Sequence, residues 1–222
     1  MTPQCIGIIL DGNRRWAKAK GLATLEGHTE GLNNLERTVG WARDLGVKHV
    51  IVYAFSTENW KRAPEEVSHL MNLLIRAARE HFTRLAKENV RVVFVGQRER
   101  LSPDVFNAVE DIEKESANGT CTLWVCLSYG GRAEIVEAAQ AMQKSGETIT
   151  EESFANHLWT HGMPDPDLII RTGGEERLSN FLPWQSTYSE LFFTDTLWPD
   201  FSQEELQRIL NEYGTRERRM GR

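Results

Sequence analysis

"CIGIILDGNRRW" occupies Cys5 to Trp16 and combines an apolar run with a polar, arginine-rich end. Its first six residues are mostly apolar, which is typical of a strand that is buried on both faces. A carboxylate, a glycine, an amide and two arginines follow at once. Because glycine lets backbone N–H groups approach an anion and arginine matches phosphate oxygens, this strand end predicts an anion-binding rim.

Apolar runs of this kind recur along the 222 residues and alternate with amphipathic stretches. The predicted strands are Cys5–Leu10, His49–Phe55, Val90–Val95, Thr122–Leu127, Leu168–Ile170 and Leu191–Phe193. The predicted helices are Thr29–Leu45, Pro64–Lys87, Pro103–Glu115, Ala133–Lys144, Glu151–His157 and Gln203–Tyr213, with another that begins at Asn13. The alternation predicts one α/β domain over residues 1–222, with a mainly parallel six-stranded sheet flanked by helices.

Composition narrows the class of protein. The chain is 40% hydrophobic and 26% charged, as in ordinary globular proteins, and its net charge of -6 argues against general affinity for nucleic acid. Three cysteines form no CxxC pair, and neither an export signal nor a membrane-spanning apolar run is found. We therefore expect reduced, buried thiols and a cytoplasmic location.

Four of the predicted strands end in glycines, hydroxyls and arginines. These ends are Asp11–Arg15, "FSTENWKR" at 55–62, "SYGGR" at 128–132 and "RTGGEERLSN" at 171–180. Ligands of open parallel sheets bind beyond the carboxyl ends of the strands, so we expect the four ends to form one site. Several charge-assisted hydrogen bonds suit a diphosphate better than a lone carboxylate.

Two residues at this rim have more than one interpretation. Asp11 is either the ion-pair partner of the arginines or a ligand of Mg²⁺, which binds through one or two carboxylates plus substrate phosphates; Glu190 is the candidate second carboxylate. His28 lies just before a predicted helix, where it either caps that helix or binds an anion. No Walker loop, HExxH motif, zinc cluster or GxSxG elbow occurs.

The helix predicted at Pro64–Lys87 has two possible surroundings. Its apolar face either packs fully on the sheet or lines an apolar tunnel that leads away from the charged rim. A charged site that opens on such a tunnel suits an amphiphile with a diphosphate end. Trp124 would limit the length of that tunnel if its side chain points inward, and is core if it points away.

These motifs, in this order, resemble the cis-prenyltransferase family, which includes bacterial undecaprenyl diphosphate synthase. The resemblance covers essentially the whole chain. It rests on "DGNRRWA", "GH" at Gly27 and His28, "YAFSTENWKR", "SYGGR", "IIRTGGEERLSNFLPWQSTYSELFFTDTLWPDF" and the terminal "RERRMG". It implies a reaction in which isopentenyl diphosphate attacks an allylic prenyl diphosphate, diphosphate departs, and loss of a proton forms a Z double bond.

The same resemblance implies residue roles. Asp11 is expected to hold Mg²⁺ on the departing diphosphate with Glu190 as a further ligand, and Asn59 is expected to be catalytic. The residues expected to bind substrates are Gly12, Asn13, Arg14, Arg15, Trp16, His28, Ser56, Trp60, Arg62, Arg171, Arg177 and Ser179. The family also implies a homodimer, with the tail from Arg216 to Gly221 near the partner's site, and peripheral membrane contact through a lipid product.

One position departs from the family pattern and leaves the product open. These enzymes commonly carry an arginine in "GxxRxxGH", whereas "GLATLEGH" has Thr24 there. The predicted product is undecaprenyl diphosphate, for which the small Ala54 leaves room. The alternatives are a shorter Z-prenyl product, an irregular enzyme that joins two dimethylallyl units head to middle, and a noncatalytic partner subunit, which the retained Asp11 argues against.

Overall fold

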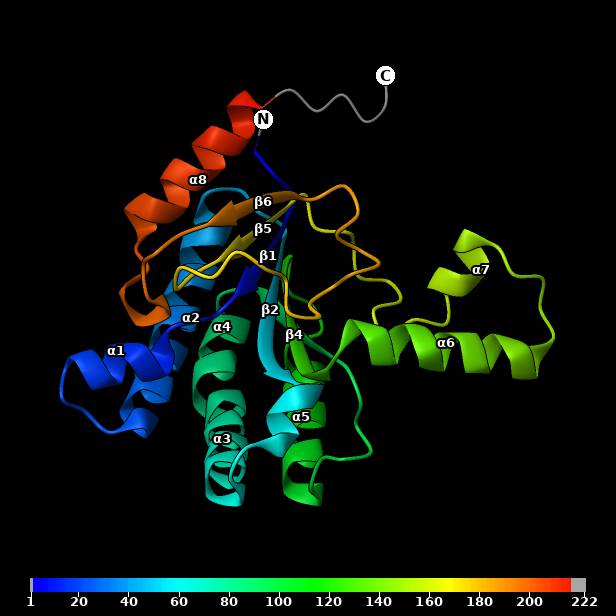
Figure 1. The fold of residues 1–222 in the computed structure, drawn as a ribbon, viewed down its shortest axis with the longest axis horizontal. Coiled ribbons are helices and arrows are strands. Elements are labelled where there is room, and N and C mark those ends of the chain that lie inside the picture. Colours follow the sequence, from blue (N-terminus) through cyan, green and yellow to red (C-terminus); the bar gives the residue numbers. More distant parts are fainter. Residues whose placement is uncertain (1, 217–222) are drawn as a thin grey trace.

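The computed structural model describes residues 2–216, and within them six parallel strands form one sheet flanked by helices (Figure 1). The strands are β1 Cys5–Ile9, β2 His49–Ser56, β3 Val90–Val95, β4 Cys121–Tyr129, β5 Leu168–Arg171 and β6 Glu190–Phe193. Their order is β3-β4-β2-β1-β5-β6. The six predicted strands are confirmed, and β4 is buried along its whole length, as is typical of a central strand in a sheet covered on both faces.

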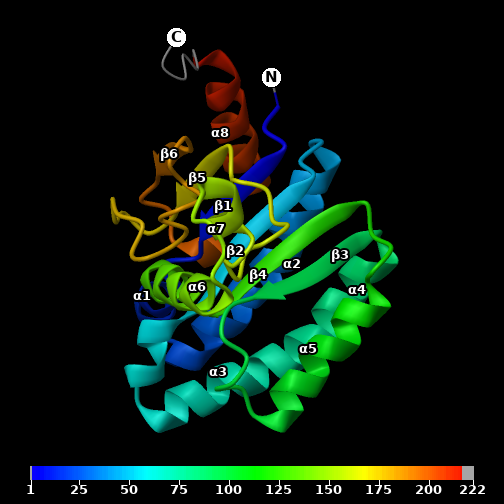
Figure 2. The ribbon, with the colours of Figure 1, turned by 90° about the vertical axis from the view of Figure 1, so that its right-hand side faces the viewer.

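The helices lie on both faces of this sheet. They are α1 Asn13–Ala19, α2 Thr24–Asp44, α3 Pro64–Arg76, α4 Thr83–Lys87, α5 Pro103–Glu115, α6 Gly131–Ser145, α7 Glu151–Ala155 and α8 Gln203–Thr215. Short 3₁₀ turns cover Thr57–Lys61 and Trp198–Asp200, and a π-helical turn at Ala77–Phe82 joins α3 to α4. Figures 1 and 2 show α6 and α7 on one side of the strands, with α2, α3, α4 and α5 on the other.

Alternation along the strands divides the core into two parts. Ile6 and Ile8 of β1 belong to the larger cluster, which packs against α2, α3 and α5. Cys5 and Ile9 belong to the smaller cluster on the opposite face, together with Trp124 of β4. Trp124 therefore points away from α3 and is core.

Helix α2 begins five residues before the predicted start at Thr29. The backbone N–H of Ala23 donates to the Glu26 carboxylate at 2.8 Å, which fixes the first turn. Gly27 lies inside this helix, and the position requires a glycine because a Cβ there would come 2.2 Å from the carbonyl oxygen of Asn13. The expectation that His28 caps the helix was wrong, because His28 lies within α2.

The strand order places the four motif-bearing strand ends side by side. β4, β2, β1 and β5 are consecutive in the sheet, so their carboxyl ends form one continuous rim. No helix within residues 2–216 is both long enough and apolar enough to cross a membrane. The family-implied role of the tail falls mainly on residues 217–222, which lie outside the described residues.

Candidate active site

Asp11 lies just beyond β1 and binds two arginines. Its Oδ2 accepts a hydrogen bond from Arg171 at 2.8 Å, and its Oδ1 accepts one from Arg15 at 3.1 Å. The Arg171 side chain is 5% exposed, whereas that of Asp11 is 30% exposed. Asp11 is thus the counter-charge of a buried guanidinium and still presents an edge to the pockets beside it.

The loop that follows β5 completes the surroundings of Arg171. One terminal nitrogen of Arg171 donates to the carbonyl oxygen of Arg177 and, at 2.8 Å, to Ser179 Oγ. Its buried Nε has no hydrogen-bond partner. The Arg177 guanidinium pairs with Glu175, so in this structure Arg177 contributes its main chain, and not its charge, to the group around Arg171.

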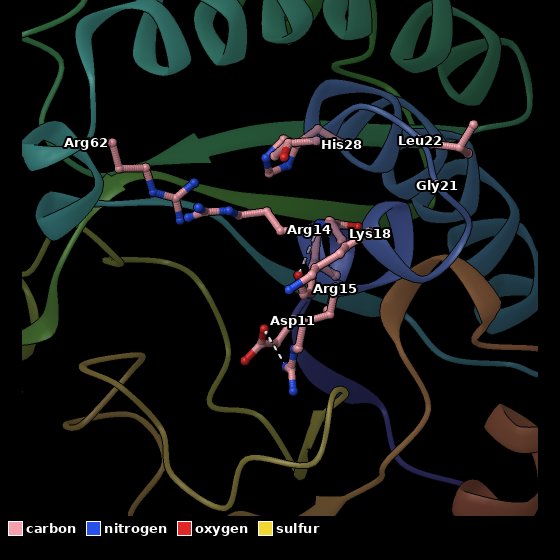
Figure 3. A pocket seen from close by; sticks show the side chains of 12 residues that line it. Asp11, Arg14, Arg15, Lys18, Gly21, Leu22, His28 and Arg62 are labelled. Carbon is pink, nitrogen blue, oxygen red and sulfur yellow. Dashed lines mark hydrogen bonds and ion pairs between the residues drawn. The ribbon is translucent and has the colours of Figure 1, made fainter.

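A large polar pocket, the first pocket, lies beside α1. It has a volume of about 800 Å³. Its lining residues are Leu10, Asp11, Gly12, Asn13, Arg14, Arg15, Lys18, Gly21, Leu22, Thr24, His28 and Arg62. Figure 3 shows the Arg14 and Arg62 side chains reaching toward each other near His28. Because cationic side chains outnumber Asp11 in this wall, the pocket favours an anionic ligand.

A second polar pocket, the second pocket, lies on the other side of Asp11. It has a volume of about 470 Å³. Its lining residues are Ile9, Leu10, Asp11, Asn13, His28, Tyr53, Ala54, Ser56, Glu58, Asn59, Arg62, Leu70, Arg171, Ser179 and Asn180. The ends of β1, β2 and β5 all contribute to this pocket. It therefore joins three of the four motifs that the sequence predicts to form one site.

An apolar cavity of about 110 Å³ begins where the two polar pockets meet. Its lining residues are Leu10, Asn13, His28, Gly31, Leu32, Leu35, Ala54, Phe55, Leu70, Met71, Leu73, Leu74, Ala77, Phe82, Val125, Leu127 and Trp198. Leu10, Asn13 and His28 line all three spaces. A ligand with an anionic head and an apolar tail matches this junction.

His28 lies at this junction, with a side chain that is 11% exposed. Burial, followed by the positive charge of Arg62, lowers its pKa to about 4. Its Nε2 has no hydrogen-bond partner and lies 3.8 Å from Glu66 Oε1, which itself accepts a hydrogen bond from Arg62. At neutral pH the imidazole is therefore uncharged, and it can hydrogen-bond to a ligand.

The last residue of β2, Ser56, and the segment after it, with Asn59 and Arg62, line the second pocket. The Ser56 backbone N–H donates to Asn59 Oδ1 at 3.0 Å, which shapes the turn. Trp60 Nε1 donates to Ser128 Oγ at 2.9 Å, so this indole fastens the loop to β4. Trp60 is absent from the linings of the three spaces, contrary to its expected place at a substrate.

Trp16 and Glu190 also lie apart from the pockets. Trp16 Nε1 donates to the Asp200 carboxylate at 2.7 Å. Glu190 begins β6, opposite Leu168 at the start of β5, and its carboxylate accepts a hydrogen bond from Arg216 at 2.6 Å. Strand starts lie at the sheet edge opposite to the strand ends, so the structure does not bring Glu190 to Asp11.

Metal-binding clusters are absent from residues 2–216, in which no three His, Cys, Asp or Glu side chains could hold an ion together. Sequence reasoning missed several pocket residues, among them Lys18, Glu58 and Asn180. Lys18 follows Arg14 by four residues, which places both on one face of α1. Glu58 and Asn180 stand within motifs that the sequence already singled out, so their neighbours were the available signal.

The chain as a whole is similar to known proteins. A family model described as "Putative undecaprenyl diphosphate synthase" matches residues 9–221. The isoprenyl transferase of Neisseria gonorrhoeae is 46% identical over 222 residues, which cover 99% of this chain and 90% of that protein. The isoprenyl transferase of Thermotoga maritima is 45% identical over 225 residues, with 99% and 97% covered.

Solved structures agree over the full length. Lavandulyl diphosphate synthase from Lavandula x intermedia, in complex with dimethylallyl diphosphate, superposes with a TM-score of 0.95 at 36% identity, covering 100% of this chain and 99% of that one. A probable undecaprenyl diphosphate synthase from Campylobacter jejuni superposes with a TM-score of 0.86 at 30% identity, covering 100% of both chains. Both likenesses include every element around the three spaces.

Proposed function

Because the chain belongs to the undecaprenyl diphosphate synthase family of prenyltransferases, we propose that it condenses isopentenyl diphosphate with an allylic prenyl diphosphate to make undecaprenyl diphosphate, a lipid carrier for cell-wall synthesis. The observation that carries this proposal is the junction at Leu10, Asn13 and His28. There, two polar pockets and an apolar cavity share their walls. Two diphosphates and one growing hydrocarbon need these three spaces.

Each substrate is assigned by the residues around it. The first pocket would take the allylic diphosphate, with Gly12, Asn13 and Arg15 around it and the hydrocarbon directed into the apolar cavity. The second pocket would take isopentenyl diphosphate, where Arg171 and Ser179 stand in the wall. Two substrates held side by side react as if at very high concentration, which is a large part of catalysis.

The cationic residues of the first pocket would stabilise the negative charge of the departing diphosphate. As the bond between the allylic carbon and its diphosphate oxygen breaks, negative charge grows on the leaving group. Arg14, Arg15 and Lys18 lie where they stabilise this charge without reorganisation. The C4 atom of isopentenyl diphosphate then bonds to the allylic carbon, and a proton passes from C2 to the released diphosphate, which leaves the new double bond. In this proposal, Asn59 orients isopentenyl diphosphate so that this proton can leave.

Magnesium fits the site as an ion that is shared with the substrate. Mg²⁺ commonly binds through one or two carboxylates plus substrate phosphates. Asp11 is the carboxylate that lines both polar pockets, and Arg15 and Arg171 fix its orientation. Asp11 would hold the ion, and the bound ion would neutralise charge on the departing diphosphate. Glu190 does not join Asp11 within one subunit.

Turnover assays test the proposal directly. The protein is incubated with Mg²⁺, labelled isopentenyl diphosphate, and either farnesyl or geranyl diphosphate. The extracted products are then identified by mass spectrometry. The expected result is a series of Z-prenyl diphosphates that ends at the undecaprenyl length. A series that ends earlier would replace the product by a shorter Z-prenyl diphosphate. No product with either starter would overturn the proposal.

A second candidate function is head-to-middle coupling of two dimethylallyl units. It is supported by the likeness to lavandulyl diphosphate synthase and by Thr24, a neutral residue in the wall of the first pocket. Dimethylallyl diphosphate supplied alone separates the two candidates, because only an irregular coupling enzyme forms product without isopentenyl diphosphate.

The proposed assembly is a homodimer in the cytoplasm. Its support is the exposed edge strand β6, on which Leu191 and Phe193 are 38% and 36% exposed, with Tyr188 nearby at 72%. Apolar groups on a sheet edge commonly mark an interface. Membrane contact would be peripheral and would occur when the lipid product leaves.

A further inference from the structure

Asn180 connects two loops and the start of a helix at the rim of the second pocket. Its Nδ2 donates to Glu58 Oε1 at 2.9 Å, which reaches the loop after β2. Its Oδ1 accepts the backbone N–H of Arg132 at 2.9 Å, and its carbonyl oxygen accepts that of Gly131 at 3.0 Å, which reaches the start of α6. Asn180 itself belongs to the loop after β5.

The backbone of this loop is held in an uncommon conformation. Ser179 and Asn180 both have positive φ, 50° and 71°. Asparagine tolerates this left-handed region better than most residues, which explains why it can stand at 180. Gly130 provides the space, since a Cβ there would come 2.9 Å from Asn180 Nδ2. The contacts made by the Asn180 side chain therefore stabilise a loop shape that the backbone disfavours.

The same loop holds the key arginine of the second pocket. Ser179 Oγ and the carbonyl oxygen of Arg177 accept hydrogen bonds from one end of Arg171, while Asp11 accepts one from the other end. Burial alone would raise the pKa of Glu58, but hydrogen bonds from its own backbone and from Asn180 lower it below its ordinary value. Glu58 is thus a charged anchor for the loop at neutral pH.

We propose that Asn180 is a positioning residue that fastens the loop after β5 to Glu58 and Arg132, and so holds Ser179 and Arg171 ready for isopentenyl diphosphate. This inference rests on the proposed function, because it assumes that the second pocket takes that substrate. Asn180 lines the second pocket and is absent from the lining of the first. Its loss therefore affects one substrate more than the other.

Two substitutions that exchange the hydrogen-bond donor and acceptor between positions 58 and 180 test the proposal. Asn180→Asp keeps the acceptor for Arg132 and the tolerance of positive φ, but it sets a carboxylate against Glu58. Loss of one charge-assisted hydrogen bond should raise KM for isopentenyl diphosphate about tenfold, with KM for the allylic substrate nearly unchanged. Glu58→Gln alone should raise this KM less than Asn180→Asp does, since a glutamine oxygen still accepts a neutral hydrogen bond from Asn180. The double variant, Asn180→Asp with Glu58→Gln, should restore KM because the amide now donates in the opposite direction.

Two outcomes would overturn the positioning role. If the double variant is no better than Asn180→Asp, Asn180 acts by direct contact with the diphosphate, which an aspartate repels whatever its neighbour. If both values of KM rise together, the change is a general structural one. The dissociation constant of inorganic diphosphate, measured by calorimetry on the same four proteins, provides a readout without turnover. A wild type that forms no prenyl product would overturn the proposed function alone, since loss of diphosphate affinity in Asn180→Asp and its return in the double variant still test the loop contact.

Discussion

Asp11 has both a place in the pockets and a structural ion pair, so a substitution there can affect turnover and stability at once. It lines both polar pockets, and it is the counter-charge of Arg171, whose side chain is 5% exposed. Truncation to alanine would leave the buried Arg171 guanidinium without its counter-charge, which is costly for reasons unrelated to catalysis. A useful variant must keep the hydrogen bond to Arg171 and remove only the charge.

Asp11→Asn meets this requirement. The amide oxygen can still accept from Arg171, but the residue can no longer hold a cation or share a full negative charge. We expect turnover to fall about 10²–10³-fold, as for other losses of electrostatic stabilisation. We expect the free energy of unfolding to fall by only about 1–2 kcal/mol, because one charge-assisted hydrogen bond becomes a neutral one. Initial rates at saturating substrate and urea unfolding measure the two effects.

Asp167→Asn is the matched control. The Asp167 carboxylate accepts hydrogen bonds from the backbone N–H groups of Gln4 and Cys5 at 2.7 and 3.1 Å. These residues lie at the amino ends of the strands, away from the pockets. This variant should lose stability without a comparable loss of turnover. If Asp11→Asn were to turn over at nearly the wild-type rate, Asp11 would be an ion-pair partner only.

His28 makes stability depend on pH. Its pKa is lowered to about 4 in the folded protein, chiefly by burial, against about 6.5 in an unfolded chain. Between these two values the unfolded chain binds a proton that the folded chain does not, so stability falls as pH falls through this window. From pH 7 to pH 5 this histidine should remove on the order of 2 kcal/mol from the free energy of unfolding.

Comparison of His28→Gln with the wild type isolates this contribution. Urea unfolding at pH 7 and pH 5 should show a smaller loss of stability for His28→Gln, because its side chain does not titrate. His161→Gln removes a histidine at an exposed position and should keep the wild-type difference. A wild-type difference that persists in His28→Gln would assign the pH dependence to other groups.

At the scale of elements, a bulge in β2 shapes the junction of the three spaces. Tyr53 pairs with Cys126 of β4, and Phe55 pairs with the next residue, Leu127, so Ala54 is an extra residue. Bulges re-aim side chains beside active sites. Ala54 lines both the apolar cavity and the second pocket, which places its small side chain where a growing hydrocarbon would pass.

Ala54→Leu should therefore shorten the product. A larger side chain at the entrance to the apolar cavity leaves less room for the hydrocarbon, so chain growth should stop earlier. Mass analysis of products formed with an excess of isopentenyl diphosphate measures the change. Trp124→Phe is the control, because Trp124 packs in the cluster on the opposite face of the sheet. An unchanged product distribution in Ala54→Leu would place the path of the hydrocarbon elsewhere.

Sequence reasoning predicted the strands well and some helix boundaries poorly. Buried parallel strands are short, continuous apolar runs bounded by turn residues, and such runs are typical of a sheet that is covered on both faces. The start of α2 was missed because Gly27 reads as a break in a helix. Its reason is a close approach to Asn13 from another helix, which local sequence does not reveal.

The candidate site was predictable where it follows from topology. Polar residues after β1, β2 and β5 had to meet, because parallel strands end at one edge of the sheet. Side-chain partners were not predictable, as the pairing of Arg177 with Glu175 and of Trp16 with Asp200 illustrates. Glu190 was expected beside Asp11, but it lies at the start of a parallel strand, and strand starts lie at the end of the sheet away from the rim.

At the scale of the whole molecule, β6 is the edge of the sheet nearest to α8, while β3 is the other edge. Phe192 of β6 is buried in the larger core cluster, whereas Leu191 and Phe193 alternate to the opposite side and remain exposed. Glu190, at the start of this strand, is fastened by Arg216 at the end of α8. The edge is thus ordered by contacts within the chain and yet leaves apolar groups uncovered.

Leu191→Glu should separate a homodimer into monomers, because a charge placed in an apolar interface would be buried without a partner. Light scattering after size exclusion should give about twice the chain mass of 25.4 kDa for the wild type and a single chain mass for this variant. The control is Ile149→Glu, since Ile149 is 74% exposed in the segment between α6 and α7. A Leu191→Glu variant that kept the mass of a dimer would show that β6 is not the interface. A wild type with the mass of one chain would overturn the dimer itself.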